Sequence, residues 1–121
     1  MSSKLSYSAI EKKYWPGFRD KINHSEDCME VASLFSSTVA SILNDIDDIM
    51  EVRNDEICFI PHEKTCNYSF HNRLNEGPRL KAYFEGSDIG SILDRFAYAA
   101  VNKHTHLEKH PEKTNLKIKR H

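Results

Sequence analysis

Apolar positions between residues 25 and 50 recur at alternating steps of four and three, the spacing of one face of an α-helix. The stripe consists of Cys28, Val31, Ala32, Phe35, Val39, Ile42, Leu43, Ile46, Ile49 and Met50. Ser25 is the expected N-cap, because its hydroxyl can accept a hydrogen bond from a backbone N–H of the first turn. The pattern predicts a long central helix over residues 25–50, or a shorter one that ends near Asn44.

The same spacing is heptad-like, which permits a helix-to-helix seam between two copies of the chain. The repeat is shorter than the roughly four heptads typical of coiled coils. Burial inside a single domain is therefore the favoured interpretation, and a homodimer is the alternative.

A second helical period lies in front of the central helix, over residues 6–22. Pro16 and Gly17 interrupt this period, and a proline removes a backbone donor and clashes with the preceding helical turn. We therefore expect either two short helical pieces or one helix that is kinked near Trp15.

After residue 55 the pattern changes from a helical period to the alternation of a β-strand. Residues 57–60 are a short β-favouring run, and residues 66–70 and 80–85 alternate apolar with polar side chains. The intervening loops are short. They favour a three-stranded antiparallel meander over about residues 56–85.

A final helical period predicts a C-terminal helix over about residues 88–103. The predicted fold class is α+β, with the N-terminal helices packed on the small sheet and the last helix following it. Residues 1–105 are expected to form one domain. Residues 106–121, which are basic and rich in His and Lys, are expected to form a flexible tail.

Charge and cysteine content bear on the cellular compartment of the protein. The net charge is −1, but six Lys or Arg and two Glu give residues 103–121 a charge of +4, so the preceding 102 residues carry −5. The three cysteines are an odd number and widely spaced, which does not indicate a disulfide framework. There is no signal-like apolar run and no window long enough to span a membrane. We therefore expect a cytoplasmic protein that does not contact the membrane.

Acidic residues gather at the end of the central stripe and directly after it, with Arg53 as the one basic residue among them. They are Asp45, Asp47, Asp48, Glu51, Asp55 and Glu56. Acidic patches speed association with basic partners and favour one register of docking. We interpret the chain as a small protein-binding module, such as an inhibitor or immunity-type protein that docks a basic partner, for example a nuclease toxin. The alternative is that these acids only keep the surface soluble.

Two groups of residues have the composition of a metal site. Cys58, His62, Cys66 and His71 include the thiolates and imidazoles that zinc prefers, but their spacing is not that of a zinc finger. Strand alternation would also point Cys66 and His71 to opposite faces. The second group has helical i, i+4 spacing without the glutamate of the H-E-x-x-H motif. The spacing is that of His106 and His110, in a set of histidines that also contains His104 and His121. A small metal-binding protein is the third interpretation, and we expect no cofactor.

A nucleic-acid-binding accessory protein is the second interpretation, because basic residues of the tail can contact phosphates. These residues are Lys113, Lys117, Lys119 and Arg120. The sequence has neither a P-loop nor a G-x-G-x-x-G motif. No nucleophile is accompanied by an activating pattern, and no pair of carboxylates is set apart by its environment. We therefore do not expect an enzyme.

Overall fold

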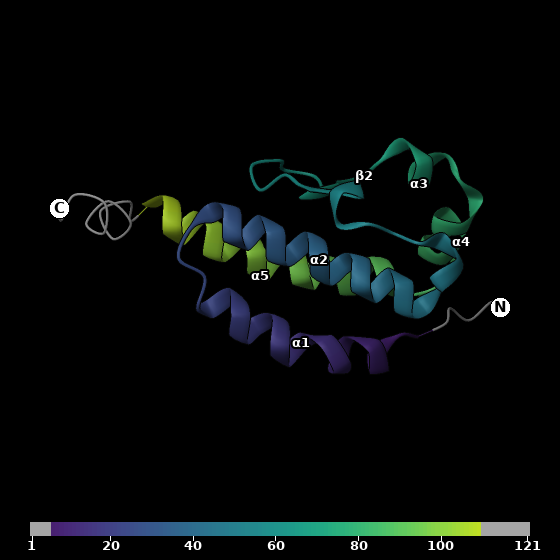
Figure 1. Cartoon of the computed structure of the whole chain (residues 1–121), viewed down its shortest axis with the longest axis horizontal. Coiled ribbons are helices and arrows are strands. Elements are labelled where there is room, and N and C mark those ends of the chain that lie inside the picture. The colour runs from purple at the N-terminus through teal and green to yellow at the C-terminus, as the bar shows by residue number, and fades with distance from the viewer. Residues whose placement is uncertain (1–5, 110–121) are drawn as a thin grey trace.

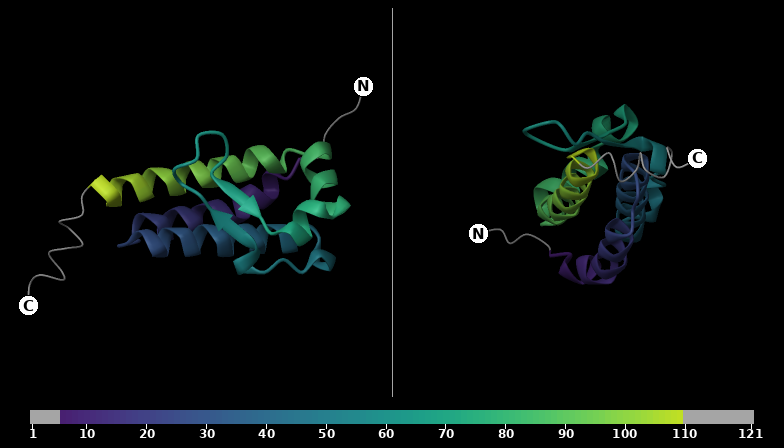
Figure 2. Two further views of the ribbon diagram at one scale, coloured as in Figure 1. Left: turned by 90° about the horizontal axis from the view of Figure 1, so that it is seen from above. Right: turned by 90° about the vertical axis from the view of Figure 1, so that its left-hand side faces the viewer.

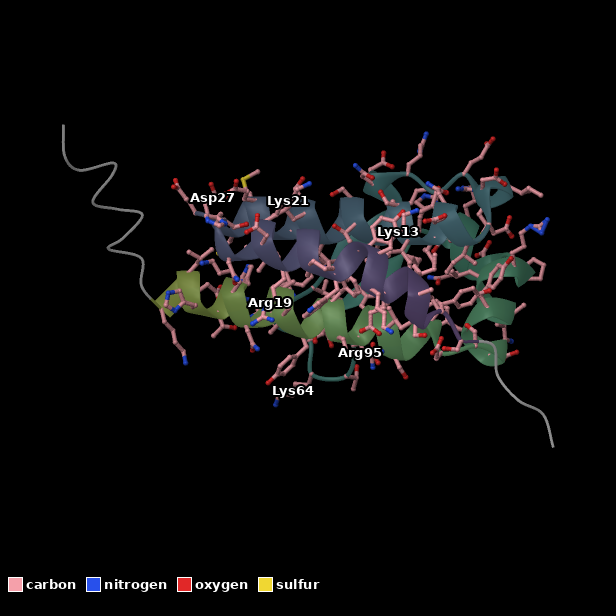
Figure 3. The ribbon with its side chains drawn as sticks, turned by 90° about the horizontal axis from the view of Figure 1, so that it is seen from below. Lys13, Arg19, Lys21, Asp27, Lys64 and Arg95 are labelled. Atoms are coloured by element: carbon pink, nitrogen blue, oxygen red, sulfur yellow. The ribbon has the colours of Figure 1, made fainter. Side chains whose placement is uncertain are left out.

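Three long helices form the framework of the computed structural model, which describes residues 6–109 (Figure 1). They are α1 (Ser8–Asn23), α2 (Cys28–Ile46) and α5 (Ile89–Lys109). All three pack against one another. Seen from the side of α1, that helix lies across α2 and α5, and Arg95 of α5 pairs with Glu11 of α1 (Figure 3).

The core lies along α2 and α5. The apolar stripe of α2 is buried as predicted, and its completely buried members are Val31, Phe35, Val39, Ile42 and Leu43. The facing side chains of α5 are also completely buried, and they are Ile89, Ile92, Leu93, Phe96 and Ala100. Because side chains of the same chain cover this stripe, it is part of the interior of the domain, which was the favoured interpretation of its spacing.

The start of α2 differs from the prediction, and its end lies close to the shorter of the two predicted ends. The N-cap is Asp27, whose Oδ1 accepts a hydrogen bond from the Glu30 backbone N–H at 2.8 Å. Ser25 is buried and its hydroxyl donates instead to the Lys21 carbonyl at 3.0 Å, so it closes the end of α1. At the other end α2 stops at Ile46, and a separate 3₁₀ turn, η1 (Asp48–Met50), follows.

α1 is a single helix that includes Pro16, rather than two pieces. Proline removes a backbone donor, but tertiary packing stabilises both sides of it. The Trp15 and Phe18 rings lie 5.1 Å and 4.9 Å from the ring of Phe96, measured between centroids. The aromatic contacts with α5 therefore hold α1 in one orientation on both sides of the proline.

Within the part of the chain that the structure describes, the sheet has two strands, not three. β1 (Ile57–Phe59) and β2 (Tyr68–Phe70) are antiparallel, with Cys58 opposite Ser69. The hairpin packs on α2, because the rings of Phe59 and Tyr68 lie 5.2 Å and 5.7 Å from the ring of Phe35. The loop between the strands extends over α5 (Figure 2, left).

The predicted third strand is helical. After α3 (Asn72–Glu76), residues 78–86 form α4 (Pro78–Gly86), with the proline in the first helical turn. Leu80, Tyr83 and Phe84 have i, i+3, i+4 spacing and pack on the core from one helical face. Proline at the first helical position fits a helix start, where its missing N–H has no role.

The C-terminal helix was predicted, but it is longer than expected. α5 continues to Lys109, so the first residues of the expected tail are helical and Leu107 is buried. The rest of that segment, residues 110–121, lies outside the described part of the chain. Within residues 6–109, none of the helices combines the length and the apolar character needed to cross a membrane.

Candidate functional site

Asp45, the first of the predicted docking acids, lies in the last turn of α2. The others follow α2 in a segment that contains η1 and a second 3₁₀ turn, η2 (Asn54–Glu56). We call residues 47–56 the acidic loop. The structure separates its carboxylates into a group that is bonded inside the chain and a group that faces solvent. This separation decides which of them can meet a partner.

Glu56 belongs to the interior. Its side chain is 4% exposed, and Arg73 of α3 binds it through Nε at 2.6 Å and Nη2 at 2.8 Å. The backbone N–H of Arg53 donates a third hydrogen bond at 2.9 Å. These bonds, the one from Arg73 above all, lower the pKa of Glu56 to about 2 against the opposing effect of burial. Glu56 is therefore a structural carboxylate and not part of an accessible patch.

Asp45 and Asp47 are also engaged within the chain. Asp45 accepts hydrogen bonds from Lys13 Nζ at 2.7 Å and from the Tyr14 hydroxyl at 3.0 Å, and the Lys13 bond lowers its pKa. Asp47 caps η1 by accepting from the Ile49 N–H at 3.1 Å. Its other oxygen accepts from the Tyr83 hydroxyl at 3.0 Å. Both aspartates connect α2 to neighbouring helices.

The backbone of the acidic loop is fixed at several points. Arg73 Nη2 donates to the carbonyls of Met50 and Glu51, both at 3.1 Å. The Asn44 side chain forms a reciprocal pair with Val52, donating at 2.9 Å and accepting at 2.8 Å. Glu51 has a left-handed backbone (φ 48°, ψ 56°), which a non-glycine residue adopts only where its surroundings hold it.

The outward face of this fixed loop carries Asp48, Glu51 and Asp55, all exposed. Asp55 lies 3.4 Å from Arg53 in a surface ion pair. Between Asp48 and Glu51 lies Ile49, whose side chain is 69% exposed although the sequence had placed it in the core stripe. The loop thus presents one apolar side chain with carboxylates beside it.

The predicted metal ligands are mostly not brought together. Cys58 and Cys66 are exposed on the hairpin, and His71 caps α3, where its Nδ1 accepts from the Arg73 N–H at 3.1 Å. His106 lies on α5, and His110 lies outside the described residues. None of these joins a group of three donor side chains within residues 6–109.

His62 does belong to such a group, with His104 and Glu108 of α5. The His62 Nε2 atom lies 3.0 Å from one Glu108 oxygen, and the His104 Nδ1 atom lies 3.5 Å from the other. We call these three residues the histidine cluster. The i, i+4 spacing of His104 and Glu108 could be read from the sequence, but His62 is 46 residues from Glu108 and joins them only through the fold.

The basic residues proposed for nucleic acid lie outside the described part of the chain. They are Lys113, Lys117, Lys119 and Arg120. Comparison with known proteins adds no identity, because no family model, no curated protein and no solved structure matches this chain. Function is therefore inferred from the residues and their geometry.

Proposed function

We propose that this chain is a protein-binding module that docks a basic surface of a partner protein through the outward face of the acidic loop. The observation that carries the proposal is the exposed Ile49, placed between Asp48 and Glu51 on a backbone that other residues fix. A single exposed apolar side chain is common on protein surfaces. An apolar centre with a charged rim on a rigid loop is the arrangement of a protein interface.

Rigidity favours binding, because a loop that is already ordered loses little conformational freedom when a partner docks. Arg73 and Asn44 supply this order through their bonds to the loop backbone. The partner meets a surface that needs no rearrangement. Buried Met50 and Val52 anchor the loop from beneath, so the outward side chains keep their positions.

The charge of the loop indicates the chemistry of the partner. Asp48 and Glu51 favour a surface rich in Lys and Arg, with a shallow apolar depression that accepts Ile49. A nuclease toxin is one class of protein with such a cationic surface, since it must bind phosphates. An inhibitory or immunity-type role follows from this complementarity and rests on the docking proposal.

The first experiment places the photo-crosslinking residue p-benzoylphenylalanine at position 49 of the full chain in its source cell. The matched control places it at Met29, which is 83% exposed and lies at the opposite end of α2. We expect one protein to crosslink from position 49 and not from position 29. Equal crosslinking from both positions would contradict a specific docking face.

The second experiment measures the affinity of the crosslinked partner, once purified, for the Asp48→Lys, Glu51→Lys double variant. We expect about a tenfold or greater loss at low ionic strength and a smaller loss at about 0.5 M salt, where screening is strong. The control double variant, Asp20→Lys with Glu26→Lys, changes the same charge near the turn between α1 and α2. An equal loss of affinity in both double variants would mean that only the net charge of the chain matters for binding. Unchanged affinity in the Asp48→Lys, Glu51→Lys variant would mean that these acids only keep the surface soluble.

The choice of positions matters for this test. Reversal of Asp45 or Asp47 removes bonds to Lys13, Tyr14 or Tyr83 and therefore disturbs the fold as well as the surface charge. Asp48 and Glu51 direct their side chains to solvent. Reversing the charge of these two residues therefore tests binding without a change in the stability of the fold.

A further inference from the structure

The histidine cluster points to a second site, which is independent of the docking loop. We propose that His62, His104 and Glu108 bind a divalent transition-metal ion, with Zn²⁺ as the ion that suits the donor set. Two imidazole nitrogens and one carboxylate oxygen are donors that zinc accepts. The distances, the burial of one donor and the position in the fold support this assignment.

The spacing of the donor atoms fits one ion. In a tetrahedral zinc site the donors lie about 3.3 Å apart, since each bond to the metal is about 2.0–2.2 Å. Here His62 Nε2 lies 3.0 Å from one Glu108 oxygen and His104 Nδ1 lies 3.5 Å from the other oxygen of the same carboxylate. One donor atom from each of the three side chains can be chosen so that all lie within 4.8 Å of one another. Small rotations of the exposed His62 and Glu108 side chains bring them onto one ion.

The second observation is a buried nitrogen that makes no hydrogen bond, although a Glu108 oxygen lies 3.5 Å away. His104 has a side chain only 12% exposed, and its Nδ1 atom is inaccessible to solvent and has no hydrogen-bond partner. Among the side chains of residues 6–109, it is the one buried nitrogen or oxygen atom that lacks a hydrogen-bond partner. An unsatisfied buried polar atom destabilises the folded state, because it has lost its hydrogen bonds to water. A metal ion bound at Nδ1 removes this destabilisation, because the nitrogen lone pair then has a partner.

Neighbouring rings hold the cluster in place. The His104 ring contacts Phe59 of β1 at 5.9 Å between centroids, and it meets the His62 ring nearly perpendicularly at 5.6 Å. The Cys28 thiol donates to the His104 carbonyl at 3.9 Å, so it packs on the backbone of the site and adds no fourth donor. The imidazole of His104 is therefore oriented before any ion arrives.

His62 comes from the loop between β1 and β2, which extends over α5 (Figure 2, left). In the view from below, Lys64 of this loop emerges on the far side of α5 from α2 (Figure 3). The loop is shaped by Asn67, whose side-chain nitrogen donates to the carbonyls of Ile60, Pro61 and Glu63. An ion at the cluster joins this loop to the last turns of α5.

Electrostatics near a helix C-terminus also favour a cation. His104 and Glu108 lie in the last two turns of α5 as described, where the helix dipole places partial negative charge. Three protein donors leave a fourth position of the zinc ion for water or for a donor from another molecule. Since His62 and Glu108 are exposed, this position faces solvent.

The test uses the full chain with His110→Ala and His121→Ala, which removes other imidazoles from the C-terminal segment. Titration with Co²⁺, followed by visible absorption, reports the coordination number, and competition with Zn²⁺ gives the affinity. We expect one equivalent of Co²⁺ to give an intense tetrahedral spectrum. The variants His62→Ala and Glu108→Gln are each expected to weaken Zn²⁺ binding by at least about tenfold.

The matched control is His106→Ala, which removes an imidazole from the same helix two positions from His104. We expect Zn²⁺ affinity in this variant to match that of the parent chain. His62 and Glu108 are exposed, so their variants remain folded, which circular dichroism verifies before titration. Sub-stoichiometric binding in the parent chain, or equal losses in His106→Ala and His62→Ala, would overturn the proposal.

Discussion

The acidic loop and the histidine cluster lie at opposite ends of α2, and their polar groups are bonded in opposite ways. In the acidic loop the buried carboxylate of Glu56 has every oxygen paired, with Arg73 and a backbone N–H as donors. In the histidine cluster the buried Nδ1 of His104 has no hydrogen bond. The chain itself satisfies the hydrogen bonds of Glu56, whereas the His104 nitrogen needs a ligand from outside the chain.

Whether a buried polar group has a partner distinguishes structural residues from functional ones better than its charge does. A buried group that is fully paired reports on folding, and replacing it disturbs the fold. A buried group without a partner has a cost that folding alone does not offset, and a ligand can remove that cost. By this criterion only the exposed side chains of the acidic loop are available to a partner protein. In the histidine cluster, the buried Nδ1 atom of His104 is available to an ion.

The largest expected effect is the loss of the Glu56 partner. Arg73→Ala removes both bonds to the carboxylate and both bonds to the loop carbonyls, leaving a buried charge unpaired. We expect the free energy of unfolding to fall by about 3 kcal/mol in urea titrations. The control, Arg53→Ala, breaks only a surface ion pair and should change it by less than about 1 kcal/mol. Equal effects would contradict the structural role of Glu56.

A somewhat smaller effect is expected at the other end of α2. Zn²⁺ at about 100 times its dissociation constant should raise the free energy of unfolding by about 2.7 kcal/mol, because it binds only the folded chain. Glu108→Gln should show far less stabilisation at the same concentration. Mg²⁺, which prefers oxygen donors, serves as the control and should have no effect. If Zn²⁺ stabilises the parent and Glu108→Gln equally, the ion binds elsewhere.

The pH dependence of stability sharpens the comparison further. Folding lowers the pKa of Glu56 to about 2 from 4.5, so its contribution is complete above pH 4.5 and is lost as the pH falls toward 2. Each pH unit inside this window costs about 1.4 kcal/mol, so about 2 kcal/mol is lost by about pH 3. The advantage of the parent chain over Glu56→Gln should shrink by this amount between about pH 6 and pH 3. A constant difference would mean that Glu56 titrates normally.

The helical faces could be predicted because they depend on local spacing alone. Phe35 and Phe96 lie on stripes that a single helical period defines, and both are completely buried. The segment around Tyr83 could not be assigned so simply. Leu80 and Phe84 fit both the alternation of a strand and the i, i+4 spacing of a helix, and packing and Pro78 decide for the helix.

The roles of the polar residues could not be predicted, because their partners are distant in sequence. Arg73 is 17 residues from Glu56, and Lys13 is 32 residues from Asp45. A count of acids therefore finds a patch without showing that three of its carboxylates are bonded inside the chain. The sequence-based metal candidates kept His62 in a different group from the histidines of α5, and they did not include Glu108, which the fold brings to His62.

The smallest expected change in stability tests the outward face of the acidic loop. Ile49→Ser removes an apolar side chain that contributes little to the core, so the free energy of unfolding should change by less than about 0.5 kcal/mol. Affinity for the partner crosslinked from position 49 should nevertheless fall about tenfold, because an anchor at the centre of an interface carries much of its binding energy. Met29→Ser, a control at a side chain that is also largely exposed, should change neither quantity. A loss of stability without a loss of affinity would mean that Ile49 has a structural role, as Glu56 does. The docking face would then have to lie elsewhere.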